Sequence, residues 1–249
     1  MPDGVHRRSI GHDTTAVLVE ATGCWAWLDR DTRNIWEAAL NGRLPQLVDE
    51  LCRLGYQREQ VQAAVSQTVN RLTSEGMLAT HHRAVKTAVR PGGASPRPGA
   101  GWTDPITPGN SQLPLRIRAV ALVGLAASLA ALRLPLRRLL RALVPLRRLP
   151  AARGDHAEIL YRAVVEVRPA WWPGRIACME MSLATVLAAA LCGRRVHWVL
   201  GARPLPNEAH AWVVVEGGGA LGLDGPDQNN PVRPWVPVIT TPPPARVNR

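Results

Sequence analysis

A stretch rich in proline and glycine interrupts the chain between residues 81 and 113. It contains Pro-Gly-Gly, Ser-Pro-Arg-Pro-Gly and Thr-Pro-Gly-Asn and almost no periodic apolar pattern, which is typical of an extended or flexible linker. A chain of 249 residues has room for two compact domains. The sequence therefore predicts domains at residues 1–80 and 114–240, joined by this linker and followed by a disordered tail at residues 241–249.

The positive charge of the chain is concentrated in its middle. Of a formal net charge of +11, residues 81–150 carry +11, while residues 1–80 carry −2 and residues 151–249 carry +2. A nucleic-acid-binding domain needs a basic face that neutralises phosphates. We therefore expect no nucleic acid among the partners of the first domain.

The sequence also speaks against bound cofactors and metals. Neither a P-loop nor a G-x-G-x-x-G motif occurs, so nucleotide binding has no local support. The pair His81-His82 has no cysteines or acids at metal-ligand spacing. The four cysteines form no C-x-x-C pair, and the first residues lack the apolar stretch of a secretion signal. We expect a cytoplasmic protein without cofactors.

Residues 115–149 alternate leucine- and alanine-rich runs with arginines. Only 14 uncharged residues separate Arg118 from Arg133, too few to cross a hydrocarbon core of about 30 Å. The simplest prediction is a helix packed on the second domain. An arginine-rich surface for a protein partner or for anionic lipid, and hence peripheral membrane association, is the alternative.

Residues 1–80 predict a short β-ribbon followed by three helices. Strands are expected at residues 15–20 and 24–28, and helices at about residues 29–40, 44–54 and 57–76. Asp29 or Asp31 can cap the first of these helices. A ribbon with three helices is a winged-helix arrangement. Trp25 and Trp27 share one face of a strand, where they serve either the core or the binding of a ligand.

The second domain combines a nucleophile, a base and an acid. Helices are expected at about residues 155–168 and 178–192, and strands at about 195–200, 209–215 and 220–224. Cys178 opens a helix, His210 lies on a strand, and Asp224 ends the next strand. Because the first turn of a helix presents unpaired N–H groups, we expect Cys178 to be biased toward the thiolate.

Strand parity decides which acid can reach the histidine. If Glu216 pairs with Ala220 across a three-residue glycine loop, Asp224 lies on the same face of the sheet as His210. Asp227, at odd separation and beyond Pro226, is the weaker candidate. The triad is therefore predicted as Cys178, His210 and Asp224.

These residues resemble the B proteins of lasso-peptide biosynthesis, which are transglutaminase-like cysteine peptidases. The resemblance covers roughly residues 115–230. It is carried by Cys178-Met-Glu-Met-Ser-Leu183, Gly-Arg-Arg-Val-His-Trp at 193–198, Gly201, and Ala209-His-Ala-Trp-Val213 with Glu216.

The resemblance implies an α+β protein: a winged-helix-like recognition element followed by a transglutaminase- or papain-like cysteine peptidase domain. Cys178 is then the nucleophile, His210 the base and Asp224 the residue that orients the imidazole. The partners implied are the leader of a lasso precursor, held near Trp25 and Trp27, and an ATP-dependent, asparagine-synthetase-like cyclase that receives the freed core. Acyl transfer to an amine and a non-catalytic precursor-binding scaffold are the two alternative functions.

Overall fold

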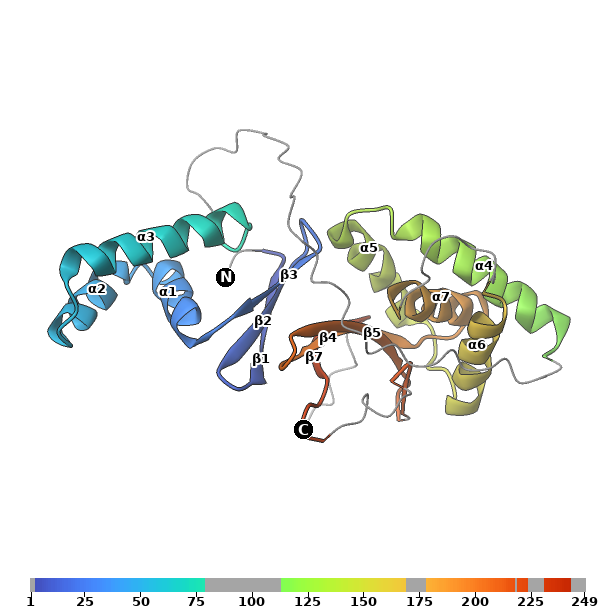
Figure 1. The fold of residues 1–249 in the computed structure, drawn as a ribbon. Helices are drawn as coiled ribbons and strands as arrows, with labels where there is room; N and C mark the ends of the chain where they lie inside the picture. The colour runs from blue at the N-terminus through green and yellow to red at the C-terminus, as the bar shows by residue number, and fades with distance from the viewer. Residues whose placement is uncertain (1–2, 79–112, 169–177, 218, 224–230, 243–249) are drawn as a thin grey trace. The chain divides into compact units, whose positions relative to one another are not determined.

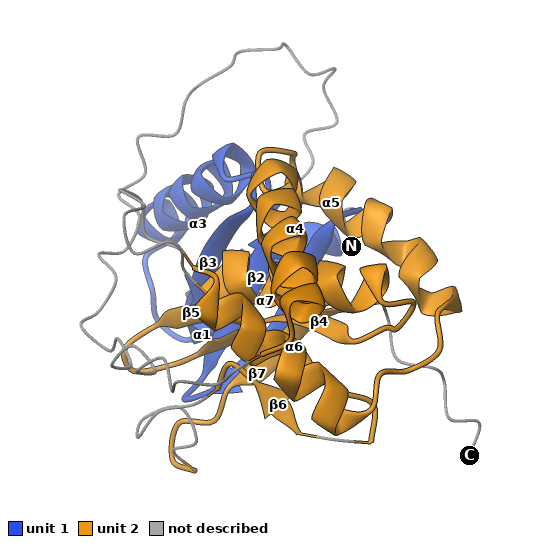
Figure 2. Ribbon diagram, turned by 90° about the vertical axis from the view of Figure 1, so that its right-hand side faces the viewer, with its two compact units in different colours: residues 1–98 blue, residues 99–249 orange. Residues whose placement is uncertain are grey.

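The computed structural model describes residues 3–78, 113–168, 178–217, 219–223 and 231–242. The chain forms two compact units, residues 1–98 and 99–249 (Figure 2). The division falls inside the predicted linker, of which residues 81–112 lie outside the described part of the chain.

The N-terminal unit begins with an antiparallel sheet of order β1-β2-β3 (Figure 1). Its strands are β1 (Val5–Gly11), β2 (Thr14–Val19) and β3 (Cys24–Leu28). The sequence predicted β2 and β3 but missed β1. The centre of β1 is the polar run Arg7-Arg8-Ser9, which hides the alternating apolar signal of a strand.

Three helices follow the sheet as predicted: α1 (Arg30–Leu40), α2 (Leu44–Arg53) and α3 (Arg58–Ser74). The Asp29 carboxylate caps α1 by accepting a hydrogen bond of 2.8 Å from the Thr32 amide. Trp36 is fully buried, and its indole donates to the Met77 carbonyl at 3.1 Å. Three strands and three helices in this order are compatible with a winged helix, and that assignment stays a prediction.

The C-terminal unit layers helices on a sheet. Its helical elements are α4 (Leu115–Ala131), α5 (Leu136–Leu143), the 3-10 helix η1 (Val144–Arg148), α6 (Gly154–Glu166) and α7 (Cys178–Leu191). Helix α7 lies between α4 and the sheet (Figures 1 and 2).

The packing of α4 on α7 is close because Gly124 has no side chain. A Cβ at Gly124 would lie only 2.7 Å from the Ala184 carbonyl oxygen. The prediction of a helix packed on the second domain is therefore confirmed for α4. Among the described helices, none is both long and apolar enough to cross a bilayer.

The sheet of the C-terminal unit has the strand order β6-β5-β4-β7, all antiparallel. Its strands are β4 (His197–Arg203), β5 (Glu208–Val214), β6 (Ala220–Leu221) and β7 (Val236–Thr241). The two central strands, β4 and β5, carry His197, Trp198, Gly201 and residues 209–213 of the resemblance, and α7 carries residues 178–183.

Strand β7 was not predicted, because Pro237 and Pro242 argue against a strand in its sequence. It pairs with β4 at the edge of the sheet, where a proline is tolerated. Thr241 is buried opposite Trp198, and the His197 ring donates from Nδ1 to the Pro242 carbonyl at 2.7 Å. The predicted start of a tail at residue 241 is therefore wrong.

The register between β5 and β6 also corrects a prediction. Ala220 pairs with Val214 and not with Glu216. Glu216 lies beyond the end of β5, and its carboxylate forms an ion pair with Arg195. The connection spans residues 215–219, two more than expected. Because three and five are both odd, the facial parity on which the argument about the acid rested is preserved.

Candidate active site

Cys178 is the first residue of α7, and its sulfur meets the backbone of β5. The backbone N–H groups of Ala211 on β5, of Met179 and of Cys178 itself are near enough to the sulfur to favour its thiolate form. The hydroxyl of Ser182, one turn later, donates to the Cys178 carbonyl and accepts 2.9 Å from the Trp198 indole. These contacts fix the start of α7 against the sheet.

The sulfur lies at the side of β5 that faces β6. The Val215 N–H donates to the Gly219 carbonyl at 3.3 Å, so it points toward β6. Since alternate residues of a strand direct their backbone groups to the same side, the Ala211 N–H points there too. Strand β6 pairs with β5 only at Val213 and Val214. The Ala211 N–H beside the sulfur therefore lies just beyond the last backbone pair between β5 and β6.

His210 reaches the same edge of β5. Its Nε2 lies 2.8 Å from the Gly222 carbonyl oxygen, one residue beyond β6. A carbonyl only accepts, so Nε2 must carry the proton of the neutral ring. Nδ1 is then left with its lone pair and is the nitrogen able to take a proton.

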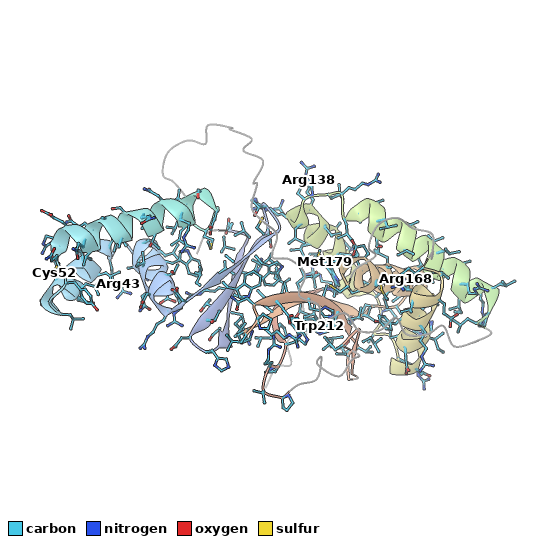
Figure 3. All side chains as sticks on the ribbon, in the orientation of Figure 1. Arg43, Cys52, Arg138, Arg168, Met179 and Trp212 are labelled. Carbon is cyan, nitrogen blue, oxygen red and sulfur yellow. The ribbon has the colours of Figure 1, made fainter. Side chains whose placement is uncertain are left out.

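The His210 side chain projects from the sheet face opposite α7. Trp198 and Val213 are cross-strand partners, and Trp198 contacts Ser182 of α7, so their face is the helix-covered one. By strand alternation His210 and Trp212 share the other face, as predicted (Trp212 is labelled in Figure 3). Among the described residues no hydrogen bond joins the Cys178 sulfur directly to the His210 ring. The two groups meet the β5 backbone at neighbouring residues and at one edge.

Aromatic rings enclose His210. The ring centroid of Trp212 is 6.3 Å from that of His210, and the ring centroid of Trp235 is 5.1 Å away. Trp235 was not predicted as part of the site, since it lies outside any recognised motif. A tryptophan in a sequence of mostly polar and proline residues was the one available signal.

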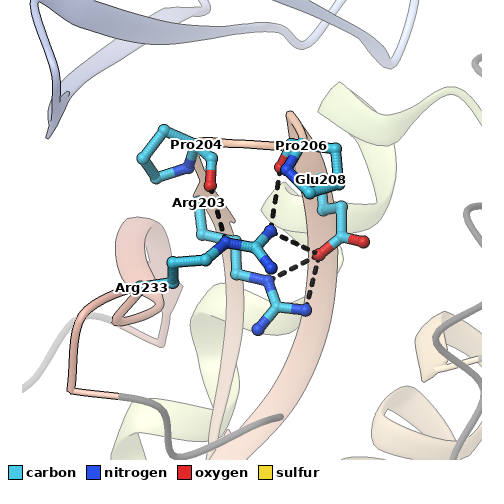
Figure 4. Close-up of polar contacts among 5 residues, drawn as sticks. All are labelled: Arg203, Pro204, Pro206, Glu208 and Arg233. Atoms are coloured by element: carbon cyan, nitrogen blue, oxygen red, sulfur yellow. Dashed lines mark hydrogen bonds and ion pairs between the residues drawn. The ribbon is translucent and has the colours of Figure 1, made fainter.

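An ionic cluster of Arg203, Glu208 and Arg233 lies next to the ring of Trp235 (Figure 4). Arg203 is only 3% exposed, and its guanidinium lies 4.3 Å from the ring centroid of Trp235. Its Nε donates to Glu208 at 2.5 Å, while Arg233 donates to the Pro204 carbonyl at 3.1 Å and to Glu208 at 3.4 Å. The cluster ties the turn between β4 and β5 to the segment that carries Trp235.

The electrostatics of the site favour uncharged side chains. Burial raises the pKa of the Cys178 thiol above its ordinary value, and the Glu180 carboxylate adds to the rise, although three backbone N–H groups oppose it. Burial lowers the pKa of the His210 imidazole, and the charge of Arg203 lowers it further, against the Gly222 carbonyl. Both directions oppose charge on these two side chains, contrary to the expectation that the helix start favours a thiolate at Cys178.

Of the remaining predicted site residues, the structure describes the two tryptophans and not the two aspartates. Asp224 and Asp227 lie outside the described residues. Trp25 and Trp27 are half-buried on β3, with ring centroids 6.3 Å apart. The Nε1 of Trp27 is buried and has no hydrogen-bond acceptor among the described residues. A buried donor without an acceptor is uncommon.

A hollow on the N-terminal unit was not foreseen from the sequence. It has a volume of about 470 Å³ and lies between β1 and α1, at the sheet edge away from Trp25 and Trp27. Its lining consists of Arg7, Arg8, Ser9, Thr15, Arg33, Asn34 and Glu37. No group of described residues offers three or more metal-ligating side chains.

Comparison with known proteins identifies the second domain. No curated protein and no solved structure matches the chain significantly. Residues 120–236 match the family described as the transglutaminase-like superfamily. This range contains α7 with Cys178 and β5 with His210. Residues 120–236 are thus a transglutaminase-like superfamily domain.

Proposed function

We propose that this protein is a cysteine peptidase that removes the leader from a ribosomally made lasso-peptide precursor. The observation that carries the proposal is that the Cys178 thiol and the His210 ring lie beside backbone groups on the same edge of β5, the Ala211 N–H and the Gly222 carbonyl across from it. Members of the transglutaminase-like superfamily are usually cysteine-protease-like enzymes. The lasso assignment rests on the sequence resemblance described above.

The tautomer of His210 decides which ring nitrogen acts as the base in the first chemical step. With Nε2–H donated to Gly222, Nδ1 takes the thiol proton as the Cys178 sulfur attacks the scissile carbonyl carbon. The tetrahedral adduct then expels the amine, which leaves with the proton held on Nδ1, and a thioester remains. Water attacks the thioester while His210 takes its proton; the C–S bond then breaks, the leader departs as a carboxylate, and His210 returns the proton to the Cys178 sulfur.

Substrate binding has to bring the ring and the sulfur into line, because catalytic hydrogen bonds are often loose before substrate arrives. Asp224 follows Gly222 by two residues in sequence. When substrate binds, its carboxylate is proposed to replace the Gly222 carbonyl as the acceptor of the His210 Nε2–H and so to orient the imidazole. The Cys178 N–H, at the start of α7, is proposed to stabilise the oxyanion.

The free edge of β3 is the proposed site for the leader. The Val19 carbonyl accepts from the Gly23 N–H at 2.8 Å and thus points toward β3, where Val19 pairs with Cys24. By alternation the backbone groups of Trp25 and Trp27 point away from β2. An added strand at this edge would bond to them. The indole N–H of Trp27, buried and without an acceptor among the described residues, is proposed to turn outward and donate to the leader.

The test is cleavage of the precursor followed by mass spectrometry. Cys178→Ala should lower turnover on the order of 10⁴-fold or more while leaving leader binding intact. A product leader with a free carboxylate supports hydrolysis, and a new amide supports acyl transfer. Unchanged turnover in Cys178→Ala would remove the peptidase proposal and favour a binding scaffold.

The same assay tests the acid. Asp224→Asn should lower turnover about 10³- to 10⁴-fold, as loss of an orienting carboxylate does, and far more than Asp227→Asn. The reverse ranking would assign the role to Asp227.

A further inference from the structure

The outer surface of α4 and α5 carries arginines that have no acidic partner. From Leu113 to Ala152 the sequence holds eight arginines and neither aspartate nor glutamate. All eight are exposed: Arg116, Arg118, Arg133, Arg137, Arg138, Arg141, Arg147 and Arg148. Among the described residues, none of them forms an ion pair. By contrast Arg153 and Arg162, on or beside α6, each lie against a carboxylate.

The same surface exposes large apolar side chains. Among the described residues, five of the eleven exposed large hydrophobic side chains lie in this segment, although it is a small part of the chain: Leu115 (81% exposed), Leu122 (51%), Val123 (54%), Leu134 (46%) and Val144 (37%). A helix surface normally pairs charge outside with apolar groups inside. Here α4 is apolar on both sides, because Ala121 and Leu125 face α7 while Leu122 and Val123 face outward.

Helix α5 adds the charge. It buries Leu139, Leu140 and Leu143 and places Arg137, Arg138 and Arg141 on the opposite side. Figure 3 shows the Arg138 side chain extending away from the unit. Helix α4 lies on the side of α7 away from the sheet (Figures 1 and 2), and the short connection at residues 132–135 joins it to α5. The exposed sides of these two consecutive helices thus combine leucine and valine with unpaired arginines.

We propose that this α4–α5 surface docks on an anionic lipid bilayer. Arginines bind phosphate headgroups, and their long stems allow the charge to stay at headgroup level while neighbouring apolar side chains enter the acyl boundary. An acidic protein would satisfy the charge alone, but it gives no reason for exposed Leu122 and Val123 beside it. Neither α4 nor α5 is long and apolar enough to cross a bilayer, so the proposed contact is with the bilayer surface.

The test is sedimentation of the full chain with vesicles, without any peptide substrate. Wild type should bind vesicles of phosphatidylcholine with about 30% phosphatidylglycerol, whose surface is anionic. It should release them at high salt, which screens the charges. Because each arginine near such a surface contributes about a fivefold gain in affinity, Arg137→Gln/Arg138→Gln/Arg141→Gln should weaken binding about 100-fold. Leu122→Ser/Val123→Ser should weaken it further.

A matched control separates this surface from the general charge of the chain. Arg30, Arg43 and Arg53 are exposed on the N-terminal unit, and Arg30→Gln/Arg43→Gln/Arg53→Gln removes the same charge. This control should bind within about twofold of wild type, a difference small against the 100-fold effect expected at the α4–α5 surface. The proposal is overturned by absent binding to the anionic vesicles, by equal binding to pure phosphatidylcholine, or by an equal loss in the control variant. Because no cleavage is measured, its failure is separate from failure of the peptidase proposal.

Discussion

At the residue scale, the ionisation of Cys178 and His210 decides how the site works. Burial raises the pKa of the thiol and lowers that of the imidazole, so in the proposed mechanism proton transfer accompanies attack. A preformed thiolate–imidazolium pair would instead need the thiol to be the stronger acid of the two. The difference is measurable without a substrate.

Alkylation of Cys178 by iodoacetamide should therefore rise with pH at a midpoint above that of an ordinary thiol. Cys24, which is exposed, serves as the internal reference in the same protein, read by peptide mass spectrometry. Comparing midpoints and not rates removes the effect of limited access to the buried sulfur. A plateau of Cys178 alkylation already reached at neutral pH would show that the ion pair forms and that general-base attack is the wrong description.

At the element scale, the sheet around the site depends on a close approach at Gly201. A Cβ there would lie 2.3 Å from the Trp212 ring and 2.6 Å from the Val236 carbonyl oxygen. Gly201→Ala should therefore push β4 from its neighbours and lower the free energy of unfolding by about 1–3 kcal/mol, measured by urea denaturation. Gly154→Ala, at the open start of α6, is the control and should change it by less than about 0.5 kcal/mol. Equal stability of the two variants would contradict the packing described for β4.

At the scale of the whole molecule, two compact units separate the proposed capture of the leader from its cleavage. Trp27→Ala should weaken leader binding and lower kcat/KM about tenfold or more, because an aromatic contact and an indole hydrogen bond are lost. It should leave the pH profile of Cys178 alkylation unchanged, since Trp27 and Cys178 belong to different units.

The control for the leader site lies on the other edge of the same sheet. Arg8 lines the hollow beside β1, and Arg8→Ala should leave leader binding within about twofold of wild type if the leader adds to β3, as expected for a surface residue outside the contact. Fluorescence titration of a labelled leader in the Cys178→Ala background measures both variants. A larger loss in Arg8→Ala would place the leader at β1.

Elements with a clear local signal were predictable. The α1 to α3 helices, β2, β3, α6 and α7 follow their apolar periodicity, caps and glycines, as does the placement of Cys178 at a helix start. Strands β1 and β7 were not, because an arginine pair and two prolines mask their patterns. The register of β6 was misjudged by two residues, since a glycine-rich turn leaves its own length undetermined.

The sequence by itself determined that the chain has two folded parts and that its positive charge is concentrated in the linker and at the start of the second part. It also predicted Cys178 and His210 as the residues suited to nucleophilic chemistry. These are local properties, legible in composition, periodicity and spacing. Only the tertiary structure decided the proton on Nε2 of His210, the raised pKa of the thiol, and the presence of Trp235 and Arg203 around the imidazole. Each of these depends on desolvation and on contacts between segments far apart in the chain. Neither the desolvation nor the contacts can be predicted from neighbouring residues in the sequence.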